Sequence, residues 1–263
     1  MNSYDPEEDV QRSIELEDRY GHLPAEHLIR LALLELFPGQ IAVTSSFGIE
    51  AAVLLHMVSR VDPTVPVVFV DTGRHFPETL GYVDQLSSHL QLSHVQRVQP
   101  DAQALAQQDP EGQLALSDAD RCCYLRKVAP IQPVMGRYSA WITGRKRCHG
   151  GTRELLPALE VVGGQVKFNP LAGWCRAELN SWYERHQLPR HPLEAKGYGS
   201  VGCAPCTHPA NVEGDPRAGR WAGQEKKECG IHVATPQISN PAAQPLPVLN
   251  GLGLKLSKPN PQG

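Results

Sequence analysis

Four of the seven cysteines stand in two close pairs whose spacing suits a metal centre. Cys203 and Cys206 form a Cys-x-x-Cys motif, in which two thiolates on a tight turn can reach one tetrahedral site. Cys122 and Cys123 are adjacent, and adjacent residues of a helix point about 100° apart. Such a pair fits two different irons of a cubane cluster better than one zinc ion. A structural zinc site is the alternative that the spacing leaves open.

A fifth cysteine, Cys229, stands alone among charged residues and is the candidate nucleophile. Only a thiolate attacks, and a free thiol has a pKa of about 8.5. Lys226, Lys227 and His232 are placed in the sequence to lower that pKa, whereas Glu228 opposes them. The odd number of cysteines and the lack of an apolar signal segment argue against a secreted disulfide framework. Clustered cysteines in a reducing compartment more often bind metal or react.

Basic residues form a second chemical feature, in a loop after residues 140–143 and in a Gly/Pro-rich run ahead of Cys229. Such residues favour an anion site, because Arg can bind anionic oxygens in bidentate fashion and glycines let backbone amides join in. A solvated charged loop is the alternative. The basic residues are Arg145, Lys146, Arg147, Arg153, Arg217 and Arg220.

A small polar loop joins a predicted strand at 40–44 to a predicted helix at 49–60. This geometry presents the amides at a helix N-terminus to an anion, and Ser45 and Ser46 add hydroxyl donors. Gly48 allows a close backbone approach. Neither a Walker A loop nor a GxGxxG motif is present. The alternative is a serine N-cap on a core helix.

A nearly all-apolar segment at 65–70 predicts a buried parallel strand, followed by a helix at 77–90. The strand ends in Asp71, Thr72 and Gly73. Open α/β sheets bind ligands at the carboxyl ends of their strands. These three residues are therefore candidates for the binding site.

The composition permits one large α/β domain, or one domain with appendages, in a soluble, cytoplasmic protein. Of 263 residues, 41% are hydrophobic, the net charge is −3, and no apolar run approaches the length of a membrane span. The charge argues against a globally basic nucleic-acid binder.

Further elements follow from periodicity: helices at 28–37, from Cys122 up to Pro130 and at 177–186, and strands at 94–98, 140–143 and 165–168. Residues 101–118 are expected to be helix and loop. We expect an N-terminal extension at 1–24, a nucleotide-binding and metal-binding domain at 25–210 and a C-terminal catalytic segment at 211–232. A disordered tail is expected at 233–263.

Five motifs together resemble the assimilatory sulfonucleotide reductases, which reduce adenylyl sulfate (APS) or phosphoadenylyl sulfate (PAPS). They are Thr44-Ser45-Ser46-Phe47-Gly48, Asp71-Thr72-Gly73 with Phe76-Pro77-Glu78-Thr79, the basic loop Gly144 to Arg153, Gly197-Tyr198 with Ser200-Val201-Gly202, and Glu228-Cys229-Gly230-Ile231-His232. The resemblance covers roughly residues 25–232. It implies an adenine nucleotide alpha-hydrolase-like (PP-loop) parallel sheet flanked by helices, with a mobile C-terminal segment.

The two cysteine pairs resemble the subgroup that carries a [4Fe–4S] cluster, which is mostly APS reductases. The resemblance implies that Cys229 attacks the substrate and that a thioredoxin-like dithiol releases sulfite. It implies no nucleic-acid or membrane partner and is compatible with a homo-oligomer. The implied substrate-binding residues are Ser45, Ser46, Gly48, Asp71, Thr72, Gly73, Lys146, Arg147, Arg153, Arg217, Arg220 and His232, and the implied cluster ligands are Cys122, Cys123, Cys203 and Cys206.

Cys148-His149-Gly150 departs from the acidic-Gln-Ser run usual in the family, which leaves the assignments in that loop open. Cys148 and Cys175 match no family position and are expected to be ordinary thiols. Three rival functions remain: a PAPS reductase, an ATP-using PP-loop enzyme, and a non-enzymatic iron–sulfur sensor or zinc-stabilised binding module.

Overall fold

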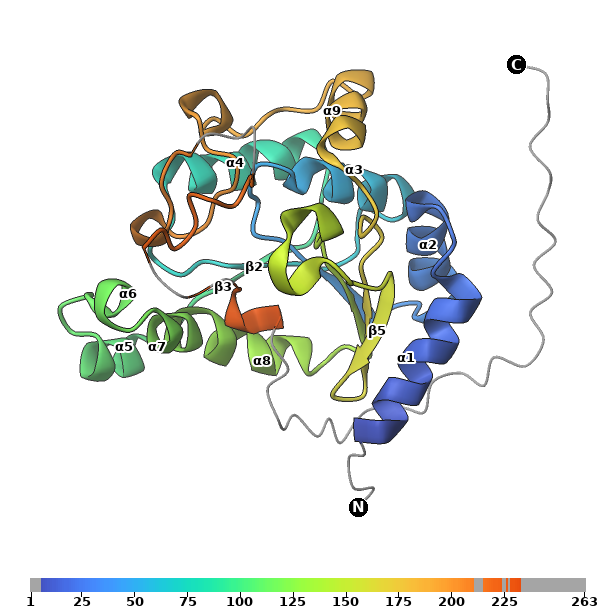
Figure 1. The fold of residues 1–263 in the computed structure, drawn as a ribbon, viewed down its shortest axis with the longest axis horizontal. Helices are drawn as coiled ribbons and strands as arrows, with labels where there is room; N and C mark the ends of the chain where they lie inside the picture. Colours follow the sequence, from blue (N-terminus) through green and yellow to red (C-terminus); the bar gives the residue numbers. More distant parts are fainter. Residues whose placement is uncertain (1–5, 211–214, 224–225, 227, 233–263) are drawn as a thin grey trace.

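Within the described residues, six strands form one sheet in the order β3-β2-β1-β4-β6-β5, with helices on both faces (Figure 1). Neighbouring strands are parallel except β5 and β6, which form an antiparallel hairpin at one edge. The predicted parallel sheet flanked by helices is confirmed, with this antiparallel edge added. The strands are β1 Ile41–Thr44, β2 Val67–Val70, β3 Val95–Val98, β4 Ala140–Ile142, β5 Leu159–Val162 and β6 Gln165–Phe168.

The structure is a computed structural model that describes residues 6–210, 215–223, 226 and 228–232. The tail predicted at 233–263 and part of the predicted catalytic segment therefore lie outside the described residues. In the described part of the chain, no helix is both long enough and apolar enough to cross a membrane.

Alternate residues of the central strands point to opposite faces and enter two separate hydrophobic clusters. Val43 and Val67 join the larger cluster, and Ala42 and Val68 join the smaller one. The helices of the larger cluster are α2 Ala25–Leu31 with its π-helical continuation η1 Ala32–Leu36, α3 Ala51–Val61, α4 Pro77–His89 and α9 Arg176–Arg185. The other face carries α8 Ala129–Met135, which continues α7 Ala119–Cys123 and the π-helical turn η2 Tyr124–Val128. Two short helices, α5 Ala102–Gln108 and α6 Leu114–Ser117, lie near α7 (Figure 1).

The prediction that the cysteine-bearing helix ends at Pro130 is wrong. The helix runs on to Met135, with Pro130 in the first turn of α8. A π-helical turn immediately precedes this proline. The first turn of α8 tolerates a residue without an N–H, and the wider π-turn accommodates its ring.

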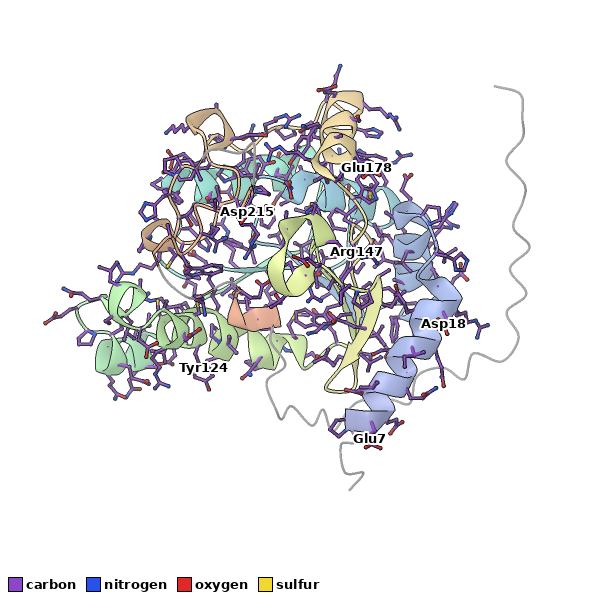
Figure 2. The ribbon with its side chains drawn as sticks, in the orientation of Figure 1. Glu7, Asp18, Tyr124, Arg147, Glu178 and Asp215 are labelled. Carbon is purple, nitrogen blue, oxygen red and sulfur yellow. The ribbon has the colours of Figure 1, made fainter. Side chains whose placement is uncertain are left out.

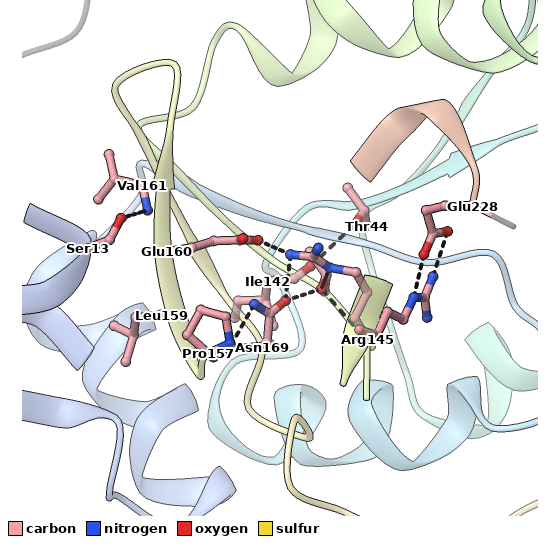
Figure 3. A network of polar contacts seen from close by, with 12 residues as sticks. Ser13, Thr44, Ile142, Arg145, Pro157, Leu159, Glu160, Val161, Asn169 and Glu228 are labelled. Atoms are coloured by element: carbon pink, nitrogen blue, oxygen red, sulfur yellow. Dashed lines mark hydrogen bonds and ion pairs between the residues drawn. The ribbon is translucent and has the colours of Figure 1, made fainter. Parts of the chain in front are cut away.

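Helix α1 Pro6–Tyr20 covers the edge strand β5, so the predicted N-terminal extension is part of the fold. Glu17 accepts hydrogen bonds from the amides of Ala158 (3.1 Å) and Leu159 (2.8 Å). Ser13 Oγ accepts one from the amide of Val161 at 2.8 Å (Figure 3). Side chains of α1 therefore satisfy amides of an edge strand that would otherwise offer them to another chain.

The remaining local structure consists of the β5–β6 hairpin turn and several short 3-10 turns. The β5–β6 hairpin itself turns through Gly163 and Gly164, whose φ angles are 62° and 76°. Two consecutive positive φ values are typical of a tight hairpin turn, which the sequence interpretation missed together with β5. The 3-10 turns are η3 Arg147–His149, η4 Gly151–Arg153, η5 Glu194–Lys196, η6 Ala204–Cys206 and η7 Gly230–His232.

Candidate active site

A cavity of about 200 Å³ lies at the carboxyl ends of the parallel strands. Thr44 ends β1, Val70 ends β2 and Thr143 follows β4, and all three line the cavity. Ligands of open α/β sheets bind at this edge. Four segments far apart in the sequence supply most of the remaining wall, within 45–54, 144–153, 199–202 and 217–231. Val68, His75, Lys127 and Ile131 also line it.

The loop after β1 lines this cavity with Ser45, Ser46 and Gly48, as the sequence analysis expected. A Cβ on Gly48 would lie 3.3 Å from the carbonyl oxygen of Val201, a tight contact with another wall segment. The close approach that this glycine permits in the structure is therefore to the 199–202 segment.

Helix α3 begins two residues beyond that loop, at Ala51, with Glu50 as its N-cap. Ser45 Oγ instead accepts the amide of Phe47 at 3.1 Å within the loop. The alternative of a serine N-cap therefore does not apply, and both serines remain on the cavity wall.

Cationic side chains also line this cavity, and two carboxylates pair with them. Lys146 Nζ and His149 Nε2 each lie 3.0 Å from Glu50 Oε2. Arg153 pairs with both oxygens of Glu228, at 2.5 and 2.8 Å (Figure 3). The basic residues that line the cavity are Lys127, Arg145, Lys146, Arg153, Arg217 and Arg220, with His149 beside them.

The pKa values report how strongly these charges act on one another. Although burial pushes the pKa of Glu50 up, Lys146 and His149 hold it well below its ordinary value. Burial, together with the nearby guanidinium of Arg153, lowers the pKa of Arg217 to about 10 and likewise that of Arg145 to about 10. The cavity therefore concentrates positive charge that needs an anionic partner.

Arg147 does not line this cavity, contrary to the expectation from the sequence. It is exposed on turn η3 (Figure 2), and its Nε donates to the carbonyl of Leu156 at 2.7 Å. Arg145 takes the inward position, where it pairs with Glu160 and donates to Asn169 Oδ1 at 3.2 Å (Figure 3). In this loop the structure therefore places Arg145, and not Arg147, on the cavity wall.

Cys229 lines the same cavity and is half-buried. A hydrogen bond from the Cys123 thiol and the charges of Lys127 and Arg220 hold the pKa of Cys229 well below its ordinary value. Of the residues that the sequence placed in this role, Lys226 pairs with Asp120 and His232 does not line the cavity. Lys227 is outside the described residues.

A second, smaller cavity brings together the four paired cysteines, Cys122, Cys123, Cys203 and Cys206. All four are buried, with 6–8% of each residue exposed. Among the described residues, no three or more His, Cys, Asp or Glu side chains are grouped so as to hold a single metal ion. Thiolates of a cubane cluster bind separate iron corners, so they stand farther apart than the ligands of one ion.

Buried N–H donors border this cysteine cavity. Lys127 lines both cavities, and Arg126 pairs with Asp109 at 2.7 Å. Within the described chain, Arg126 Nε and Trp221 Nε1 are buried without a hydrogen-bond partner. Native proteins seldom leave such donors unsatisfied, so an acceptor-rich group between them fits the site.

The predicted cluster Asp71, Thr72 and Gly73 is absent from the wall of the larger cavity. Thr72 Oγ1 instead lies 3.3 Å from Cys203 Sγ, and Asp71 Oδ1 accepts the amide of Gly73 at 3.1 Å. The end of β2 therefore contacts a cysteine of the smaller cavity through Thr72.

The sequence interpretation missed Glu50, His75 and Lys127 as cavity residues, and it counted Arg145 in the basic loop without assigning it to the substrate. For Lys127 a signal existed: it lies four positions after Cys123, which places both on one helical face. Glu50 carries no comparable mark, because an acidic residue at a helix start is common.

Comparisons with known proteins agree with one another. A family model described as the phosphoadenosine phosphosulfate reductase domain matches residues 40–209. The adenosine 5′-phosphosulfate reductase of Mesorhizobium japonicum is 46% identical over 224 residues, covering 85% of this chain and 88% of the relative. That of a Chelativorans species is 48% identical over 222 residues, covering 84% and 91%.

One solved structure also aligns well. The phosphoadenylyl-sulfate reductase of Candida auris, crystallised as a phosphate complex, has a TM-score of 0.62 and 26% identity. The alignment covers 77% of this chain and 97% of that one.

Proposed function

The chain belongs to the phosphoadenosine phosphosulfate reductase family, and on that premise we propose that it reduces adenylyl sulfate to sulfite and AMP. The relatives named adenosine 5′-phosphosulfate reductase, 46% and 48% identical, favour APS over PAPS as the substrate. One observation carries the proposal: Cys229 lines the same cavity as the loop after β1 and the basic residues.

The reaction proceeds in two thiol steps. The Cys229 thiolate attacks the sulfur of the sulfo group, a sulfur–sulfur bond forms, and AMP leaves with the electron pair of the broken sulfur–oxygen bond. A thioredoxin-like dithiol then attacks Cys229 Sγ, releasing sulfite and forming a mixed disulfide. The second thiol of that partner displaces Cys229 as a thiolate and leaves the partner oxidised.

The basic residues make the first step feasible. The phosphosulfate group is anionic and would repel an approaching thiolate unless cations neutralise it. Lys146, Arg153 and Arg217 line the cavity that Cys229 also lines, and guanidinium groups bind such oxygens in bidentate fashion. Charge fixed in place beforehand stabilises the transition state without reorganisation.

We further propose that Cys122, Cys123, Cys203 and Cys206 hold a [4Fe–4S] cluster. Four buried thiols around one cavity, with unsatisfied N–H donors on its wall, support this assignment over a zinc ion. When bound, the cluster supplies structural and electrostatic support, since the dithiol partner provides both electrons. Lys127 lines both cavities and so lies between the cysteines and the site of attack.

A cytoplasmic location is part of the same proposal. All seven cysteines lie within the described residues and are free thiols. Free thiols and a dithiol donor that must be re-reduced both suit a reducing compartment.

The test separates the two steps. Purified protein mixed with APS alone should release AMP and carry a sulfonate adduct on Cys229, detected by peptide mass spectrometry. Adding reduced thioredoxin should then release sulfite, and kcat/KM should be higher for APS than for PAPS. An adduct on another residue, or no sulfite from either nucleotide, would refute the proposal.

A further inference from the structure

Glu228, directly before the nucleophile, is bound to the cations that the substrate needs. Its Oε2 lies 2.5 Å from Arg153 Nε, and its Oε1 lies 2.8 Å from Arg153 Nη2 and 3.7 Å from Arg217 Nη2. All three side chains are largely buried, with exposed fractions of 13%, 9% and 12% respectively. The contact is a desolvated ion pair and not a surface one.

The cavity is small for a nucleotide. Its volume is about 200 Å³, whereas ligand pockets usually measure roughly 300–1,000 Å³. A nucleotide that enters this cavity therefore comes close to the charged side chains on its wall.

The wall segment that carries Glu228 is not held by the sheet. Strands β1, β2 and β4 are held by the sheet, and α3 is buried along one face. Glu228 belongs instead to residues 228–232, whose only regular element is the single turn η7. Ile231 anchors this turn on the smaller hydrophobic cluster, and the two arginines hold Glu228.

A carboxylate and a phosphosulfate group offer guanidinium groups the same chemistry. Both present anionic oxygens that accept bidentate hydrogen bonds. Taking Glu228 away would leave two buried cations without this partner, which is costly unless another anion replaces it.

We propose that Glu228 competes with the substrate: before APS binds, it occupies the positions on Arg153 and Arg217 that the phosphosulfate oxygens take. This inference rests on the proposed function. Because Glu228 Oε1 also accepts the amide of Cys229 at 2.7 Å, the exchange frees the backbone of the nucleophile when substrate arrives. Glu228 is thus a positioning residue that couples substrate entry to release of the attacking cysteine.

The test measures APS binding by calorimetry in the holoenzyme carrying Cys229→Ser, which prevents turnover. Adding Glu228→Gln removes the competing charge and should tighten APS binding about tenfold, or about 1.4 kcal/mol. A purely supporting role predicts the reverse, since a loosened wall would bind less well. Unchanged or weaker binding would overturn the proposal.

Two further variants serve as a charge control and as a substitute for Glu228→Gln. Glu154→Gln removes the same charge from the exposed residue next to Arg153 and should leave APS affinity within about twofold, because exposed charges are screened. If Glu228→Gln fails to fold, Glu228→Asp takes its place: it keeps the charge but shortens the side chain, and should bind APS about threefold tighter. Equal or weaker binding by that variant also overturns the proposal. If the Cys229→Ser parent binds no APS at all, the proposed function fails instead.

Discussion

Two adjoining cavities are both bordered by buried cations. Carboxylates pair with Lys146 and Arg153 of the larger cavity and with Arg126 of the smaller one, whereas Lys127, which lines both, lies among thiols. In the larger cavity, Lys146 lies 3.0 Å from Glu50 and Arg153 lies 2.5 Å from Glu228. In the smaller one, burial opposes the charge of Lys127, but the neighbouring thiols of Cys203, Cys229 and Cys123 raise its pKa.

The difference separates an exchangeable site from a permanent one. An incoming anion can replace a side-chain carboxylate as the hydrogen-bond partner of a cation, and the carboxylate can pair with the cation again when that anion leaves. Buried thiolates prefer soft metals, and binding of such a group is coupled to folding. We therefore expect variants of the larger cavity to change turnover with little loss of stability, and variants of the smaller cavity to change both.

The largest effect should come from the candidate nucleophile of the larger cavity. Cys229→Ser should lower sulfite formation by about 10,000-fold or more, because a hydroxyl is a poor nucleophile at neutral pH. Iron content and AMP binding should stay near those of the unaltered protein. The matched control is Cys175→Ser, an exposed N-cap of α9 at which serine caps equally well. If Cys229→Ser kept turnover within tenfold of the unaltered protein, Cys229 would not be the nucleophile.

The smaller cavity is tested by Cys206→Ala. Loss of one ligand should remove most of the iron, lower the unfolding midpoint and reduce turnover by roughly 1,000-fold, more than the 10- to 100-fold typical of outer-shell partners. Iron analysis and thermal unfolding measure this, with the exposed Cys148→Ala as control. A Cys206→Ala protein that kept its iron and its stability would show that the smaller cavity does not hold a permanently bound metal cluster through Cys206.

Neighbouring residues of the basic loop sharpen the comparison within the larger cavity. Lys146→Ala should lower kcat/KM for APS by roughly 100-fold, because it removes a fixed charge facing the reacting group. Arg147→Ala should change it by less than about threefold, since its guanidinium is exposed and bound to a backbone carbonyl. Equal losses would mean that the loop rearranges when substrate binds.

The smallest effect concerns acid stability. The pKa of Glu50 is lower in the folded chain than its ordinary value of 4.5, so its stabilising contribution is present above that pH and is lost as pH falls below it. Glu50→Gln should therefore unfold with a shallower dependence on pH below about 4.5. Urea titrations at several pH values measure this, and the exposed Glu184→Gln should keep the normal slope. An unchanged slope in Glu50→Gln would show that the Lys146 pair contributes little.

Much of the architecture could be predicted from the sequence, because strand and helix periodicities alternate clearly from residue 40 to 100. The segments 65–70 and 77–90 emerge as β2 Val67–Val70 and α4 Pro77–His89. The gathering of the four paired cysteines also followed from spacing and the resemblance, since Cys-x-x-Cys and Cys-Cys can be recognised in a linear sequence.

Which basic side chains of the 144–153 loop face the cavity and which face solvent could not be predicted from the sequence. Residues 147–153 form two 3-10 turns joined through Gly150 and Gly151, which have φ angles of 63° and 59°. No helical or strand period operates there, so no pattern distinguishes Arg145, which faces inward, from Arg147, which faces outward. The cavity that the residues after β2 contact could not be predicted for another reason. This strand end lies close to both cavities, and only the fold shows that Thr72 contacts Cys203.

The way α1 meets β5 has a consequence for anyone who shortens this chain. The sequence predicts an N-terminal extension at 1–24, yet Glu17 and Ser13 in it accept hydrogen bonds from backbone amides at and next to the edge strand β5. A protein trimmed to begin at residue 25 would expose those amides as a template for strand addition and should self-associate into aggregates. By covering these amides, helix α1 should therefore keep the folded chain soluble.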